Sequence, residues 1–164
     1  MPHSRFNDVD RDQFTAANLK ILVESEDSGV HLAVSEDGFR IIFFQGHPEY
    51  DSISLLKEYK REIGRFIHAE TDDYPPTPEN YFSLQSLAIL EEFSEKIIIA
   101  RANNQNPLDF PEDLIAALVD NTWHDSAEAV INNWIGKVYQ LTDIDRCKPF
   151  NETVDPSDPL GLNA

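Results

Sequence analysis

The sequence predicts an α/β domain with strands up to about residue 44 and helices from about residue 53 onward. Short runs rich in β-branched and aromatic residues, each bounded by turn residues, predict the strands. Longer stretches with apolar residues at helical spacing predict the helices. The length of 164 residues suits one core, and a hydrophobic fraction of 41% separates the chain from disordered proteins despite its net charge of -17.

The strands are predicted over residues 19–23, 30–34 and 39–44. Asp27-Ser28-Gly29 lies between the first and second runs, and Glu36-Asp37-Gly38 lies between the second and third. Asp-Gly sequences are typical of tight turns. The third run is apolar almost throughout, which predicts a strand buried on both faces in the middle of the sheet.

The first helix is predicted over about residues 53–66, with an apolar stripe and either Asp51 or Ser52 as its cap. A proline-rich loop at residues 74–78 follows it. Further helices are predicted over residues 84–101, from Pro111 to Val119, and over 123–141 with Thr122 as the cap. The tail from Pro149 onward is predicted to extend over the surface.

The composition excludes several classes of partner. Acidic residues outnumber basic ones by 30 to 13, which leaves no cationic surface for a nucleic-acid backbone. The longest apolar runs are far shorter than the roughly 18 residues that a membrane span needs, and the first residues lack a secretory pattern. We therefore expect a cytoplasmic protein without nucleic-acid or membrane partners. The single cysteine, Cys147, cannot form an internal disulfide, which agrees with a reducing compartment.

A histidine and a carboxylate stand two residues apart in Gly46-His47-Pro48-Glu49-Tyr50-Asp51, just past the third predicted strand. Strand ends are where α/β proteins build their sites. With Pro48 fixing the backbone between them, Glu49 can orient the imidazole of His47 and stabilise its protonated form. The pattern predicts a general base and its orienting partner. The alternative is a loop histidine beside a carboxylate that favours the dipole of the following helix.

Glu58 and Arg61 stand three residues apart on the predicted helix and therefore share a face. Such a pair can hold the charged ends of an amino acid, with Arg61 on the carboxylate and Glu58 on the ammonium group. A surface ion pair is the alternative.

Other reactive side chains lack a supporting pattern. Cys147 lies between Arg146 and Lys148, which favours a thiolate, but no nucleophile elbow surrounds it, and none surrounds the hydroxyl of Ser4. The five histidines lack the spacing of metal ligands, and there is no glycine-rich phosphate loop. We expect neither a metal nor a bound cofactor.

Six segments carry a family resemblance, in one order along the chain. They are Pro2-His3-Ser4-Arg5-Phe6, residues 22–32, Gly46-His47-Pro48-Glu49-Tyr50-Asp51, Glu58-Tyr59-x-Arg61, Pro78-Glu79-Asn80-Tyr81-Phe82 and residues 133–142. Together they resemble the C-terminal half of the homoserine O-acyltransferases of methionine biosynthesis, of the homoserine O-succinyltransferase type.

The resemblance implies the C-terminal half of a flavodoxin-like, three-layer α/β domain like that of the class I glutamine amidotransferases. This half would cover residues 1–145, with a helical insertion at about 84–106, and residues 146–164 would form an irregular tail. The family carries a Cys-His-Glu triad whose cysteine lies in the N-terminal half. Cys147 matches no family position that could replace it.

The resemblance also implies roles for individual residues. His47 would be the catalytic base and Glu49 its partner, while Ser4, Glu58 and Arg61 fall on substrate-contacting positions of the family. The acyl group of succinyl-CoA or acetyl-CoA would pass to the cysteine and then to the homoserine hydroxyl. We expect the chain alone to be inactive and to aggregate, dimerise or require a complementing chain.

Two other functions are compatible with the same residues. One is a truncated, non-catalytic homologue that binds a partner or an amino acid. The other is an amidotransferase-like hydrolase that uses His47 and Glu49 without the amino-acid clamp. The segment Trp123-His124-Asp125-Ser126 departs from the family's Trp-Arg-x-His pattern, which leaves the acceptor open.

Overall fold

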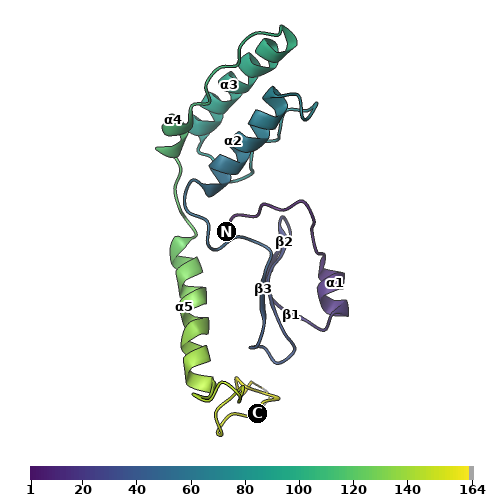
Figure 1. Cartoon of the computed structure of the whole chain (residues 1–164), viewed down its shortest axis with the longest axis vertical. Helices are drawn as coiled ribbons and strands as arrows, with labels where there is room; N and C mark the ends of the chain where they lie inside the picture. The colour runs from purple at the N-terminus through teal and green to yellow at the C-terminus, as the bar shows by residue number, and fades with distance from the viewer. Residues whose placement is uncertain (163–164) are drawn as a thin grey trace. The chain divides into compact units, whose positions relative to one another are not determined.

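The computed structural model describes residues 1–162, which fall into two compact units. Unit 1 combines Met1–Glu49 with the chain from Trp123 onward, and unit 2 is Tyr50–Thr122. Strands occur in unit 1, and helices occur in both (Figure 1). None of the helices within residues 1–162 has the length and apolar character needed to cross a membrane.

Unit 1 contains a three-stranded antiparallel sheet in the order β1-β2-β3. Its strands are β1 (Lys20–Ser25), β2 (Gly29–Val34) and β3 (Ile42–Phe44). The central strand β2 supplies most of the buried side chains of the sheet, and β1 is largely exposed. The α/β class and the two hairpins agree with the sequence, since each turn lies where an Asp-Gly or Asp-Ser-Gly sequence predicts it.

The third strand differs from its prediction. It has three residues, pairs only with β2, and so lies at an edge of the described sheet rather than in its middle. Asp37 explains the shortening, because its Oδ1 accepts hydrogen bonds from the backbone N–H groups of Phe39 (2.9 Å) and Arg40 (3.0 Å). These bonds hold the first residues of the apolar run in a turn. Ile41, the residue before the strand, is 53% exposed.

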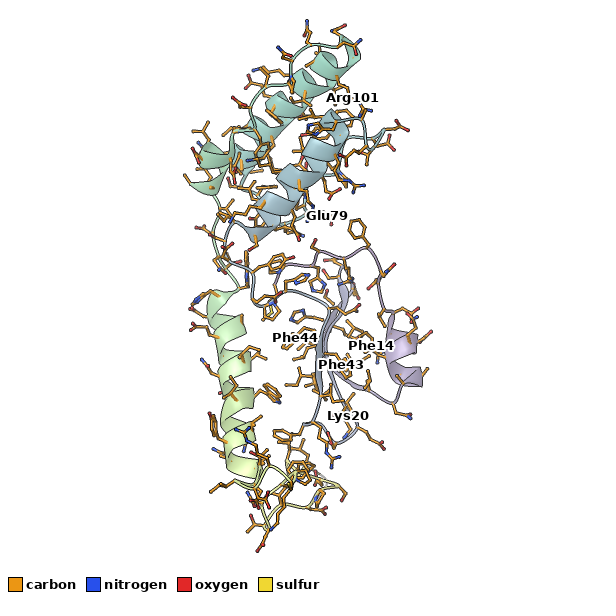
Figure 2. The ribbon with its side chains drawn as sticks, in the orientation of Figure 1. Phe14, Lys20, Phe43, Phe44, Glu79 and Arg101 are labelled. Carbon is orange, nitrogen blue, oxygen red and sulfur yellow. The ribbon has the colours of Figure 1, made fainter. Side chains whose placement is uncertain are left out.

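A short helix, α1 (Arg11–Ala16), covers one face of the sheet. Its capping box joins Asp10 and Gln13, whose side chains each bind the other's backbone N–H. Phe14 is buried against Val30 and Ala33 of β2, and Phe43 packs against the same cluster. Figure 2 shows Phe14 directed toward the sheet, and Phe44 on the opposite side of β3 from Phe43. The sequence does not predict this helix, because six residues are too few for an apolar period to be visible.

The last helix, α5 (His124–Leu141), also belongs to unit 1. Trp134 donates its indole N–H to the carbonyl of Phe39 (3.3 Å). The predicted cap is wrong by one residue, because Trp123 is the N-cap and its side chain does not cap the helix. In its described residues, up to 162, the tail folds into consecutive turns rather than extending over the surface, and Phe150 is buried with its ring centroid 5.9 Å from that of Phe39.

Unit 2 consists of α2 (Ser54–Ile67), α3 (Leu84–Ala102) and the short α4 (Glu112–Ala116). These helices confirm the three predicted for this stretch to within a few residues. Their buried core comes from all three helices and consists of Leu56, Tyr59, Ile63, Phe66, Leu90, Phe93, Ile97 and Ile115. The N-cap of α2 is Ile53, and Asp51 instead closes the preceding turn by accepting from the Ile53 N–H (3.0 Å) and the Ser54 hydroxyl (2.7 Å).

Candidate functional site

His47 lies just beyond β3, where backbone pairing continues past the strand. Gln45 donates its N–H to the carbonyl of His31 (2.9 Å), and His47 donates its N–H to the carbonyl of Pro2 (2.8 Å). The N-terminal residues therefore run beside this segment. As a result Ser4 lies next to His47, although 43 positions separate them in the sequence.

Both ring nitrogens of His47 face an oxygen atom. Nδ1 lies 2.8 Å from Oε1 of Glu49, and Nε2 lies 3.1 Å from the backbone oxygen of Ser4. Carboxylate and carbonyl oxygens only accept hydrogen bonds, so the imidazolium form of His47 satisfies both contacts. In the neutral form, a proton kept on Nδ1 by Glu49 leaves the lone pair on Nε2. His47 can thus accept a proton at Nε2 while Glu49 stabilises the resulting charge.

The charge state of Glu49 supports this pairing. Partial burial raises the pKa of the Glu49 carboxyl, but the hydrogen bond with His47, a backbone hydrogen bond and the imidazole charge together outweigh it and lower the pKa. Glu49 is therefore ionised near neutral pH, as a partner of an imidazolium must be. The side chain of His47 is 30% exposed and that of Glu49 is 66% exposed, so the pair is open to a reactant.

Two further histidines enclose Gly46, the residue before His47. A Cβ atom at Gly46 would lie 2.6 Å from Nδ1 of His31 and 2.8 Å from Nε2 of His3. The ring centroids of His3 and His31 are 5.2 Å apart. The close approach of both rings therefore requires a glycine. The sequence does not predict this cluster by helical or strand spacing, and the glycine directly before His47 is its one local signal.

Arg5 begins a chain of hydrogen bonds through these rings. Its guanidinium donates to Nδ1 of His3, and Nε2 of His3 lies 3.2 Å from Nδ1 of His31. Because a guanidinium only donates, His3 carries its proton on Nε2 and donates it to His31. Burial and then the charge of Arg5 lower the pKa of His3 to about 4. Burial, the N-terminal amine and Arg5 also lower the pKa of His31, so both rings are neutral near neutral pH.

Glu58 and Arg61 lie on α2 in unit 2, whereas Ser4, His47 and Glu49 lie together in unit 1. Glu58 and Arg61 do not pair with each other. Oε1 of Glu58 accepts a hydrogen bond from the hydroxyl of Tyr50 (2.8 Å), and Nε of Arg61 lies 3.1 Å from Oε1 of Glu62. The surface ion pair between Glu58 and Arg61 that the sequence allowed is therefore not formed.

The structure also gives the state of the single cysteine and of the possible metal ligands. Cys147 is a free, exposed thiol in the tail of unit 1. Among residues 1–162, no group of three or more histidine, cysteine, aspartate or glutamate side chains is placed to hold a metal ion.

These features define a class of protein: an α/β protein with a histidine–carboxylate pair suited to proton transfer at the end of a strand. The comparisons with known proteins narrow this class. The family model for homoserine O-succinyltransferases matches residues 1–144, and the chain belongs to that family. No solved structure matches the chain.

Several curated relatives carry the same family name. The homoserine O-succinyltransferase of Nitrosococcus oceani is 64% identical over 162 residues, and that of Allochromatium vinosum is 60% identical over 162 residues. A more distant one from Cardiobacterium hominis is 43% identical. The match covers 99% of this chain but 45% of the first two relatives, so the chain spans about half the length of the relatives it matches.

Proposed function

We propose that this chain supplies the general base and the acceptor site of a homoserine O-acyltransferase. The observation that carries the proposal is the 2.8 Å contact between Nδ1 of His47 and Glu49, in a chain that belongs to the homoserine O-succinyltransferase family. The flavodoxin-like arrangement of the whole domain is part of the same proposal. Methionine biosynthesis is the pathway that the family name implies.

The proposed reaction is acyl transfer from a cysteine thioester to the hydroxyl of homoserine. The hydroxyl oxygen attacks the thioester carbon while His47 takes its proton at Nε2, so that a C–O bond forms and the C–S bond breaks. The thiolate leaves and regains a proton from the imidazolium. The cysteine is proposed to come from the part of the relatives outside the matched 45%, since Cys147 lies in an irregular tail.

The acceptor is proposed to bind across one face of α2. Arg61 would hold the carboxylate of homoserine, since its side chain is 58% exposed and its ion pair with Glu62 is of the weak surface type. Glu58 would hold the ammonium group. Ser4 is proposed as a further substrate contact, because its backbone oxygen lies at the proton-accepting nitrogen of His47.

Succinyl-CoA is the proposed acyl donor, following the names of the relatives, and acetyl-CoA is the second candidate. Either would be a co-substrate, and no bound cofactor is required. The proposal includes a second polypeptide segment, in the same or another chain, that carries the cysteine. A homodimer is the proposed assembly for the chain on its own.

A chimaera tests this function. This chain replaces the matching segment of the Nitrosococcus oceani relative, whose 64% identity favours correct folding. We expect CoA release from succinyl-CoA that requires homoserine, and loss of that release in His47→Ala. Release without homoserine would support a hydrolase instead. Homoserine binding without release would support a non-catalytic homologue, and a parallel assay with acetyl-CoA decides the donor.

A further inference from the structure

Tyr50 and Glu58 form a contact to which neither the sequence nor the family name assigns a role. Tyr50 directly follows Glu49 in the chain and is the first residue of unit 2, and Glu58 lies on the second turn of α2. The hydroxyl of Tyr50 donates to Oε1 of Glu58 over 2.8 Å. This bond fixes one oxygen of the carboxylate on the helix face that also carries Arg61.

The second oxygen of Glu58 is in a different situation. Oε2 is buried and accepts no hydrogen bond from the described residues. A carboxylate oxygen without a donor is costly when it is removed from water. A bound ligand could supply the hydrogen-bond donor that Oε2 lacks, and an ammonium group carries three N–H donors that a carboxylate can accept.

Resting on the proposed function, we propose that Tyr50 is a positioning residue that holds Glu58 with Oε2 ready for the ammonium group of the amino-acid acceptor. The hydroxyl occupies Oε1, so the incoming cation meets one defined oxygen. Without the hydroxyl, the Glu58 carboxylate can rotate. Binding of the ammonium group must then order the carboxylate, which weakens the binding of the acceptor. Tyr50 thereby selects acceptors that carry an amine.

The spacing of α2 supports this selection. Residues three apart on a helix are neighbours, with Cβ atoms roughly 5–6 Å apart. The ammonium and carboxylate of an α-amino acid are attached to one carbon, so they can meet Glu58 and Arg61 together. Arg61 binds the carboxylate, which many metabolites have, whereas Glu58, held by Tyr50, binds the amine.

The test replaces Tyr50 by phenylalanine in the chimaera described above. We expect Tyr50→Phe to raise the KM for homoserine about tenfold, the amount typical of a lost hydrogen bond to a charged group, with kcat changed less than about twofold. The inhibition constant of 4-hydroxybutanoate, which has the carboxylate and hydroxyl but no amine, should stay the same. Tyr139→Phe, at a tyrosine that is 84% exposed on α5, is the matched control and should leave every constant unchanged.

A double variant separates positioning from folding. If Tyr50 acts through Glu58, adding Tyr50→Phe to Glu58→Gln should raise the homoserine KM no further. An unchanged KM in Tyr50→Phe, or equal weakening of homoserine and 4-hydroxybutanoate, would overturn the inference while an active parent chimaera keeps the proposed function. A fall in kcat that parallels a lower melting temperature would also overturn it, in favour of a structural role. A parent chimaera without homoserine-dependent release would overturn both.

Discussion

At the scale of single residues, the contact between His47 and Glu49 makes a direct prediction. Glu49→Gln removes the negative charge that holds the proton on Nδ1 and stabilises the imidazolium. We expect kcat of the chimaera to fall about 10–100-fold with little change in the homoserine KM. Steady-state kinetics with succinyl-CoA measure this. Glu128→Gln, at an exposed position on α5, is the control, and a loss confined to KM would contradict the assigned role.

The pKa of His3 predicts a pH dependence of stability. Burial and the charge of Arg5 lower its pKa from 6.5 to about 4 in the folded chain. Between these values the unfolded chain binds a proton that the folded chain does not. The contribution to stability is therefore complete above pH 6.5 and is lost as the pH falls toward 4. Because His3 is partly exposed, we expect His3→Gln to reduce the loss between pH 7 and 5 by about 1 kcal/mol.

Urea unfolding of unit 1 at both pH values, followed by tryptophan fluorescence, measures the change. His124→Gln is the matched control, because this histidine is 57% exposed and lies in the same unit. Equal pH dependence in His3→Gln and in the unchanged chain would contradict the prediction.

The sequence could predict the contact between His47 and Glu49 because only Pro48 separates them. It could not predict that His3 and His31 adjoin them, since that depends on where the N-terminal segment pairs beside residues 45–47. Nor could helical spacing reveal Tyr50 as the partner of Glu58, because Tyr50 precedes the helix. The sequence therefore predicts contacts between residues close together in the chain, but not those that depend on which distant segments pair.

At the scale of elements, the helices of unit 2 followed their apolar spacing, and the third strand did not follow its composition. In α3, Leu90, Phe93 and Ile97 stand at helical spacing and are buried, while Leu87 is 37% exposed. The apolar run at residues 39–44 satisfied the strand pattern, but the side chain of Asp37 binds the backbone at its start. A side chain that binds nearby backbone groups competes with sheet hydrogen bonds for those groups. Here the bonds of Asp37 hold residues 39 and 40 in a turn, and the strand begins only at Ile42.

The burial of α3 makes a prediction with an internal control. Leu90 is 2% exposed within the core of unit 2, and Leu84, at the start of the same helix, is 87% exposed. We expect Leu90→Ala to lower the free energy of unfolding by about 2–4 kcal/mol, because it removes a buried side chain and leaves a cavity. Leu84→Ala should change it by less than about 0.5 kcal/mol. Urea unfolding followed by circular dichroism measures both, and similar losses would mean that Leu84 is also buried.

At the scale of the whole molecule, each hydrophobic core lies within one unit. The cluster around Leu56 and Ile63 belongs to unit 2, and the cluster around Phe14 and Ala33 belongs to unit 1. Both tryptophans, Trp123 and Trp134, are in unit 1. Tryptophan fluorescence therefore reports on unit 1, while circular dichroism also reports on the helices of unit 2.

Separate cores predict separate unfolding. We expect the fluorescence and circular dichroism transitions of the intact chain in urea not to coincide, which a two-state protein would require. Leu90→Ala should move the circular dichroism transition to lower urea and leave the fluorescence transition in place, because the lost contacts all lie in unit 2. Coincident transitions that shift together would show instead that the two units unfold as one cooperative structure. In that case the His47–Glu49 pair in unit 1 and the helices of unit 2 would be stabilised jointly, and a substitution in α3 would also weaken the pairing of His47 with Glu49.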